Sequence, residues 1–173
     1  MEGSLGRSKW MSVDTAMTKD VICIKDTDRV SDAFLTLMEK DITGAPIVNA
    51  SGDLVGVLSV TDINRSIMGR VIRASALHQA TSSTDSDRTC EEKERVRELG
   101  IAMRAVAEST VASILPKDQK PLVLGPFDSL EHAVKMMAEH SVNRLPVVKD
   151  GKVVGIVTRQ DIVWIVAGRP HKD

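Results

Sequence analysis

Two short motifs place a hydroxyl group and a carboxylate three residues apart at the start of a predicted helix. Ser59 precedes Asp62 by three residues, and Thr158 precedes Asp161 in the same way. The free backbone N–H groups and the dipole at a helix start suit the oxygens of a phosphate. A carboxylate can accept hydrogen bonds from two vicinal hydroxyls, as on a ribose, and a hydroxyl can donate to a phosphate. The same spacing also fits an ordinary helix cap, in which the carboxylate only satisfies backbone N–H groups.

Residue types that commonly carry out catalysis or hold metal ions are not spaced for either role. The four histidines are dispersed, and the chain has no His-x-x-x-His or Cys-x-x-Cys pair. It also has no phosphate-binding loop, no nucleophile elbow and no Gly-x-Gly-x-x-Gly. The two cysteines, Cys23 and Cys90, suggest neither a disulfide framework nor a metal site. The sequence therefore predicts no catalytic residue, no metal and no cofactor, and we expect no enzyme.

The motifs belong to two copies of one unit, about 100 positions apart. Ala33 matches Ala133, Pro46 matches Pro146, and Asp62 matches Asp161 after one residue is dropped in a turn. Each copy predicts the order strand, helix, strand, strand, helix, from its apolar periodicity and its short Gly-containing turn. Neither copy alone could bury both faces of so small a sheet, so we expect an α+β fold whose two pseudo-symmetric repeats pack sheet to sheet. The predicted strands are 21–24, 46–49 and 54–60 in the first copy, and 122–124, 146–149 and 153–158 in the second.

These matches predict a first repeat over residues 12–70, a connector over 71–110 and a second repeat over 111–171. The connector contains a polar stretch over residues 81–87, which is followed by a charged helix. One face of this helix is apolar and comprises Val96, Leu99, Met103 and Val106. Its charged face is interpreted as solvated, although the apolar stripe could dock a partner chain.

Composition weighs against several kinds of partner. The 173 residues carry a net charge of −1 and no run of Lys or Arg that would follow a polyanion. Only 2% of the residues are aromatic, which weighs against nucleic-acid binding by base stacking. No segment reaches the roughly 18 apolar residues that span a bilayer, and the first residues lack the apolar stretch of a secretory signal. The expected location is therefore cytoplasmic.

The two sets of motifs resemble the CBS domain family, whose repeats occur in tandem pairs called Bateman modules. The first set is Met17-Thr18, Thr43-Gly44-Ala45-Pro46-Ile47-Val48 and Gly56-Val57-Leu58-Ser59-Val60-Thr61-Asp62-Ile63. The second set is Asn143-Arg144-Leu145-Pro146-Val147-Val148 and Gly155-Ile156-Val157-Thr158-Arg159-Gln160-Asp161-Ile162. The resemblance covers most of the chain outside the connector and the first dozen residues. It implies a stand-alone pair of CBS repeats.

In ligand-binding members of this family, the motif Asp and Thr bind ribose and phosphate, and backbone and apolar side chains hold the base. The resemblance therefore implies a favoured nucleotide site made of Asp161, Thr158, Ile156, Arg144 as the phosphate cation, Thr18, Ile22, Ile42 and Thr43. A second, pseudo-symmetric site would comprise Asp62, Ser59, Thr61, Val57, Pro116, Val142 and Asn143. This second site departs from the pattern, because Gly44 stands where Arg144 does and Pro116 replaces Thr18.

The leading hypothesis is a regulatory module that senses an adenine nucleotide (AMP, ADP or ATP) in the cleft between the repeats. S-adenosylmethionine is a further candidate ligand. As the resemblance implies, we expect a homodimer formed through exposed helix faces, acting on an unidentified regulated protein. Two alternatives stay open: a ligand-free structural module for dimerisation or scaffolding, and, more weakly, a nucleic-acid binder.

Overall fold

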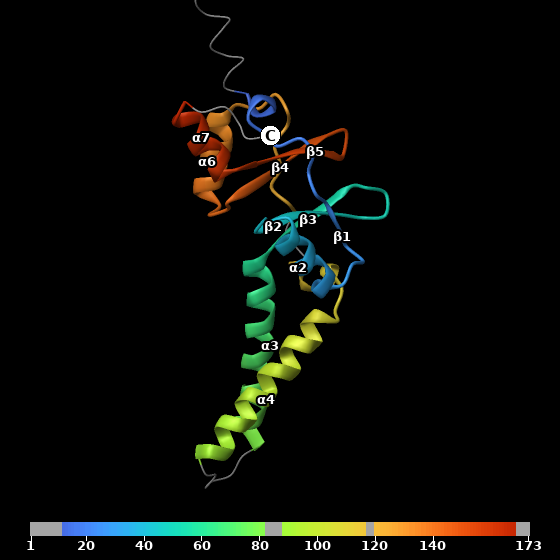
Figure 1. Ribbon diagram of the computed structural model, residues 1–173, viewed down its shortest axis with the longest axis vertical. Coiled ribbons are helices and arrows are strands. Elements are labelled where there is room, and N and C mark those ends of the chain that lie inside the picture. The colour runs from blue at the N-terminus through green and yellow to red at the C-terminus, as the bar shows by residue number, and fades with distance from the viewer. Residues whose placement is uncertain (1–11, 82–87, 117–119, 169–173) are drawn as a thin grey trace, which may run out of the picture. The chain divides into compact units, whose positions relative to one another are not determined.

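The computed structural model describes residues 12–81, 88–116 and 120–168. Figure 1 shows a mixture of helices and short strands, as the repeated pattern predicts. The elements in chain order are η1 (Val13–Thr15), β1 (Ile24–Lys25), α2 (Val30–Glu39), β2 (Gly44–Val48), β3 (Leu54–Ser59), α3 (Val60–Thr81), α4 (Arg88–Ala107), α5 (Val111–Ile114), α6 (Leu130–Glu139), β4 (Arg144–Lys149), β5 (Lys152–Thr158) and α7 (Arg159–Val166).

The first repeat has the predicted order β1, α2, β2, β3, α3, with its strands in one sheet in the order β1-β2-β3. The second repeat has α6, the antiparallel pair β4 and β5, and α7. The predicted strand 122–124 is only an isolated parallel bridge of Leu124 with Val147. The predicted strand 21–24 begins too early, because the strand β1 comprises Ile24 and Lys25. Before it, the Val21 N–H donates to the Lys19 carbonyl in a tight turn.

The helices α2 and α6 bury only part of the apolar faces that their periodicity predicts, because Phe34, Met38 and Val134 of those faces are exposed. In α6, Leu130, Ala133 and Met137 are buried at positions i, i+3 and i+7, and α2 repeats this spacing. The Ser129 hydroxyl accepts a hydrogen bond from the His132 N–H and so caps α6. Apolar residues at the flanks of these faces, such as Val134, stay exposed because they point away from the core.

Contacts divide the chain into two compact units, and each unit mixes the two repeats. Of the described residues, one unit comprises 12–23, 46–57 and 120–168, and the other comprises 24–45, 58–81 and 88–116. In the first unit the Val13 N–H donates to the Asp128 carbonyl over 2.9 Å. In the second unit the Val111 N–H donates to the Asp28 carbonyl, also over 2.9 Å. The leading segment of each repeat therefore packs at the helix start of the other repeat.

Each unit has its own apolar interior. In the first unit the buried cluster is Val13, Ala16, Leu124, Leu130, Ala133, Met137, Leu145, Val147 and Val157. The buried apolar residues of the second unit include Ile24, Val30, Ala33, Leu37, Ala45, Leu58, Ile63, Ala102, Val106 and Val111. Aliphatic side chains fill both interiors, joined by Met137 in the first unit, in keeping with the low aromatic content of the chain.

The hairpin tips of the two repeats meet in the first unit. Lys152 Nζ lies 2.6 Å from Asp53 Oδ1 and also donates to the Ser51 carbonyl. The backbone of Asp53 forms an antiparallel bridge with that of Lys152. The turns there need positive φ at Gly52 (78°) and Gly151 (81°), which glycine adopts without strain. These contacts join the β2–β3 turn to the β4–β5 turn.

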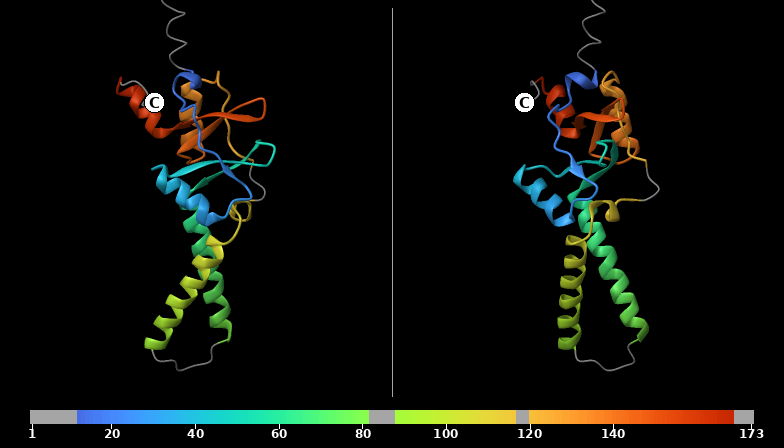
Figure 2. Two further views of the ribbon diagram at one scale, coloured as in Figure 1. Left: turned by 45° about the vertical axis from the view of Figure 1, so that its right-hand side comes forward. Right: turned by 90° about the vertical axis from the view of Figure 1, so that its right-hand side faces the viewer.

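Two long antiparallel helices, α3 and α4, extend from the second unit (Figures 1 and 2). The helix after the first motif is α3, which extends past the predicted end of the first repeat at residue 70 and ends at Thr81. The helix predicted behind the polar stretch is α4, while residues 82–87 of that stretch lie outside the described residues. Of its predicted apolar face, Val106 is buried but Val96, Leu99 and Met103 are exposed.

Candidate functional site

The hydroxyl–carboxylate motif of the second repeat forms a closed capping box at the start of α7. The Thr158 hydroxyl and the Thr158 N–H each donate to Asp161 Oδ2 over 2.7 Å. In return the Asp161 N–H donates to Thr158 Oγ1 over 3.4 Å. Asp161 is buried, with 9% of its surface exposed. The motif therefore fixes a buried carboxylate at the positive end of the α7 dipole.

The motif of the first repeat has the same box and one additional contact. Ser59 donates to Asp62 Oδ2 from its N–H over 3.0 Å and from its hydroxyl over 2.5 Å. Asp62 Oδ1 is bound in addition by Arg65 Nη1 over 3.0 Å. In the second repeat the position of Arg65 is held by Trp164, an uncharged indole. Both oxygens of the Asp62 carboxylate are thus engaged within its own helix turn.

The first unit brings together five residues of the favoured site around the end of β5. Thr18 and Ile156 pair by two backbone hydrogen bonds of 2.9 and 3.0 Å. Arg144 is the register partner of Thr158 in the β4–β5 pair. Asp161 follows on the first turn of α7. Residues that carry a hydroxyl, a guanidinium and a carboxylate are consequently neighbours at one strand end, and such groups can serve as donors and acceptors for a nucleotide.

A close approach of the leading segment to β5 positions Thr18. A Cβ atom at Gly155 would lie 2.3 Å from Met17 Sδ and 2.8 Å from Met17 Cγ, so any larger residue would force the Met17 side chain to move. This absence of a side chain lets Met17 lie on β5 and aligns Thr18 with Ile156. The pairing of Thr18 with Ile156 was not predicted from the sequence, although a glycine inside a strand is a known sign of a close backbone approach.

The remaining predicted site residues fall on both units. Ile22 is half-buried and belongs to the first unit, whereas Ile42 belongs to the second. The Thr43 carbonyl accepts from the Val60 N–H over 3.1 Å, beside the motif of its own repeat. Asn143 makes the equivalent bond with the Arg159 N–H over 3.0 Å. That Thr43 and Asn143 each serve the motif of the opposite repeat stays a prediction.

The residues of the second site are divided in a similar way. Ser59, Thr61, Asp62 and Pro116 belong to the second unit, and the other three, Val57, Val142 and Asn143, belong to the first. Pro116 has no N–H, so it cannot make the donor bond that Thr18 makes to Ile156. The first repeat's motif thus lacks an equivalent of Arg144 and of this bond.

Three further features of the described residues concern metal ligands, the Cys23 thiol and the apolar length of the helices. Among residues 12–81, 88–116 and 120–168, no three His, Cys, Asp or Glu side chains are grouped to hold a metal ion. The Cys23 side chain is exposed overall, yet partial burial raises the pKa of its thiol and so disfavours a reactive thiolate. No helix in the described residues combines the length and apolarity needed to cross a membrane.

Comparison with known proteins identifies relatives over nearly the whole chain. The family model of the CBS domain matches residues 12–69 and again residues 111–168. CBSX1, a chloroplastic CBS domain-containing protein of Arabidopsis thaliana, is 32% identical over 160 residues, which are 91% of this chain and 64% of CBSX1. The uncharacterized protein MJ1426 of Methanocaldococcus jannaschii is 27% identical over 159 residues, 88% of this chain and 89% of MJ1426. This chain thus spans less than two thirds of the plant protein.

A solved structure with the same fold is that of CBSX2 in complex with AMP. It has a TM-score of 0.62 and 26% sequence identity, and the match covers 91% of this chain and 97% of CBSX2. CBSX2 is likewise a chloroplastic protein in Arabidopsis thaliana. The match extends over both repeats, so the tandem arrangement is common to the two proteins.

Proposed function

Since this chain belongs to the CBS domain family, we propose that it is a regulatory module which binds an adenine nucleotide at the second repeat. The observation that carries this proposal is the meeting of Thr18, Arg144, Thr158 and Asp161 at the end of β5. The AMP complex of the similar protein CBSX2 supports the choice of ligand.

Each group at the end of β5 has a distinct role in this proposal. The buried Asp161 carboxylate accepts hydrogen bonds from the ribose hydroxyls. The Arg144 guanidinium binds the phosphate, because its planar fork matches two phosphate oxygens. Thr158 is the N-cap residue of α7, so the positive end of the helix dipole lies beside it and favours the same negative charge.

The adenine base requires an apolar surface rather than charge. Ile22 and Ile156 are half-buried in the first unit and offer such a surface. The resemblance adds Ile42 and Thr43 to the base site. Because the chain has few aromatic residues, aliphatic side chains and backbone groups hold the base in this proposal.

Regulation follows if the nucleotide binds one conformation of the module better than another. The shift in population is then limited by the difference in affinity between the two conformations. A homodimer formed through exposed helix faces, a regulated protein partner and a cytoplasmic location belong to the same proposal. The module has no catalytic role in it.

Calorimetric titration of the full chain with AMP, ADP, ATP and S-adenosylmethionine tests the proposal. We expect heat of binding from at least one adenine nucleotide, its loss in Asp161→Ala, and its persistence in the matched variant Asp62→Ala. Circular dichroism of both variants checks that they fold. The absence of heat from every adenine compound would refute nucleotide binding, and equal loss in both variants would refute the choice of site.

A ligand-free structural module is the second candidate, and the closed capping boxes favour it. Each box accounts for its hydroxyl and its carboxylate without a ligand. In that case Asp161→Ala costs only the stability of a helix cap, about 1 kcal/mol, and nucleotides do not change the unfolding midpoint. Melting of the wild-type chain with and without AMP separates the two candidates.

A further inference from the structure

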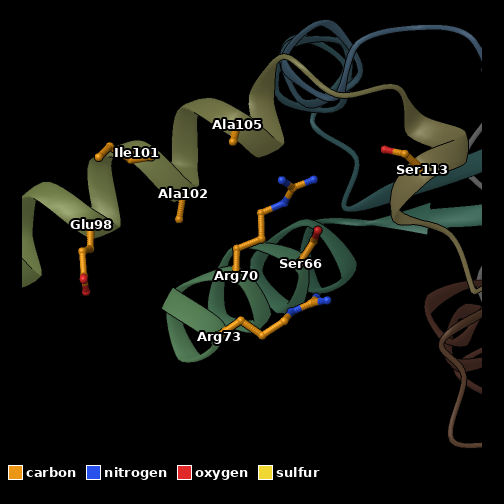
Figure 3. A pocket seen from close by; sticks show the side chains of 8 residues that line it. All are labelled: Ser66, Arg70, Arg73, Glu98, Ile101, Ala102, Ala105 and Ser113. Carbon is orange, nitrogen blue, oxygen red and sulfur yellow. The ribbon is translucent and has the colours of Figure 1, made fainter. Parts of the chain in front are cut away.

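A cavity of about 520 Å³ lies between α3 and α4 in the second unit, outside every residue assigned to the nucleotide sites (Figure 3). This volume is in the range of about 300–1,000 Å³ that is usual for small-molecule sites. Ser66, Arg70 and Arg73 line it from α3, at positions i, i+4 and i+7 of one helix face. Ser113 on α5 lines it from a third element.

The α3 wall carries two positive charges. Figure 3 shows the Arg70 side chain extending from α3 into the space between the two helices. Within the described part of the chain, its guanidinium forms no hydrogen bond or ion pair. Arg73 Nε donates to the Gly69 carbonyl over 3.0 Å, which holds the second guanidinium along the same helix. Two guanidinium groups on one wall favour a negatively charged occupant.

The α4 wall is mostly apolar. Ile101, Ala102 and Ala105 line the cavity there, and the small alanines leave room opposite Arg70. Glu98 lies on the same wall, two turns before Ala105 and at the other end from Ser113 (Figure 3). A ligand with an anionic end and a short apolar body therefore matches the cavity best, with its anionic end placed away from Glu98.

We propose that this cavity binds a small organic anion, whose phosphate or carboxylate group lies on Arg70 and Arg73 and whose apolar part contacts Ile101, Ala102 and Ala105. Guanidinium forks bind both kinds of anionic group in a bidentate manner. The site is separate from the nucleotide-binding residues, and it gives the long helices α3 and α4 a binding role.

Titration of the full chain at constant ionic strength tests the proposal with two probes, phenyl phosphate and benzoate. Both carry an anionic end on a short apolar body, and the two arms distinguish phosphate from carboxylate recognition. We expect at least one probe to bind. The double variant Arg70→Gln/Arg73→Gln should weaken that binding about tenfold or more, since it removes two charge-assisted hydrogen-bonding groups.

Three further variants serve as controls. Arg104→Gln removes an exposed charge from α4 outside the cavity and should leave binding unchanged. Glu98→Gln should strengthen it, because a negative charge leaves the cavity wall. Arg144→Gln removes the phosphate cation of the nucleotide site and should also leave probe binding unchanged. No binding of either probe, an equal loss in Arg104→Gln, or a loss in Arg144→Gln alone would overturn the proposal, whereas the AMP titration tests the nucleotide site independently.

Discussion

The two repeats build the same capping box but differ in the residue one turn further along the helix. In the first repeat Arg65 binds the Asp62 carboxylate, and in the second repeat Trp164 stands in that place. An exposed ion pair of this kind contributes only about 0–1 kcal/mol to stability, so its main effect is to occupy the carboxylate. The cap is thus common to both copies. We propose that ligand binding depends on neighbouring residues, such as Arg144 and Trp164, that only the second copy has.

The largest effect is expected at Gly155, where the absence of a side chain lets Met17 lie on β5. Gly155→Ala would place a Cβ atom 2.3 Å from Met17 Sδ and should lower the free energy of unfolding by about 1–3 kcal/mol. Urea unfolding measures this loss. The double variant Gly155→Ala/Met17→Ala should recover part of it, and no recovery would show that the Met17 contact is not the cause.

Replacing Trp164 by arginine should make the motif of the second repeat resemble that of the first. In Trp164→Arg a guanidinium can bind Asp161 as Arg65 binds Asp62, and we expect AMP affinity to fall about tenfold. Calorimetric titration gives the affinity. Trp164→Gln is the control, since it removes the indole without adding a charge. If both variants lose affinity equally, the charge at this position does not explain the difference between the repeats.

The caps themselves should differ in the stability that they contribute. Asp161→Ala leaves the Thr158 hydroxyl and N–H without their common acceptor at a buried position, so we expect a loss of about 1–2 kcal/mol. Asp62→Ala removes a more exposed carboxylate, with 29% of its side chain accessible, and should cost about 1 kcal/mol or less. Thermal unfolding of the two variants compares them, and a larger loss in Asp62→Ala would reverse the order proposed here.

The smallest effect is expected where the two hairpin tips meet. The hydrogen bond from Lys152 lowers the pKa of Asp53 below its ordinary value of 3.8. The ionised carboxylate therefore stabilises the fold at pH values above the ordinary pKa, and this contribution disappears as the pH falls through the lowered pKa. Wild type should exceed Asp53→Asn slightly in unfolding midpoint at neutral pH, and the two should converge in strong acid. A difference that persists there would exclude the ion pair as its source.

Elements with a regular pattern could be predicted from the sequence. The spacing of Val30, Ala33 and Leu37 predicts α2, and the hydroxyl–carboxylate spacing predicts both caps. The exchange of leading segments could not be predicted, because single backbone bonds such as that of Val13 to Asp128 leave no periodic signal. The contact of Arg65 with Asp62 was not predicted, because an exposed Arg on a helix looks like any other solvated residue. Only comparison with its counterpart in the second repeat, Trp164, draws attention to it.

A crystal structure of the full chain grown with AMP would test directly whether the nucleotide binds at the second repeat. We expect the ribose hydroxyls on the Asp161 carboxylate, the phosphate within reach of Arg144, and no nucleotide at Asp62. A nucleotide whose ribose lies on Asp62, or a β5 end that is empty at saturating AMP, would contradict it.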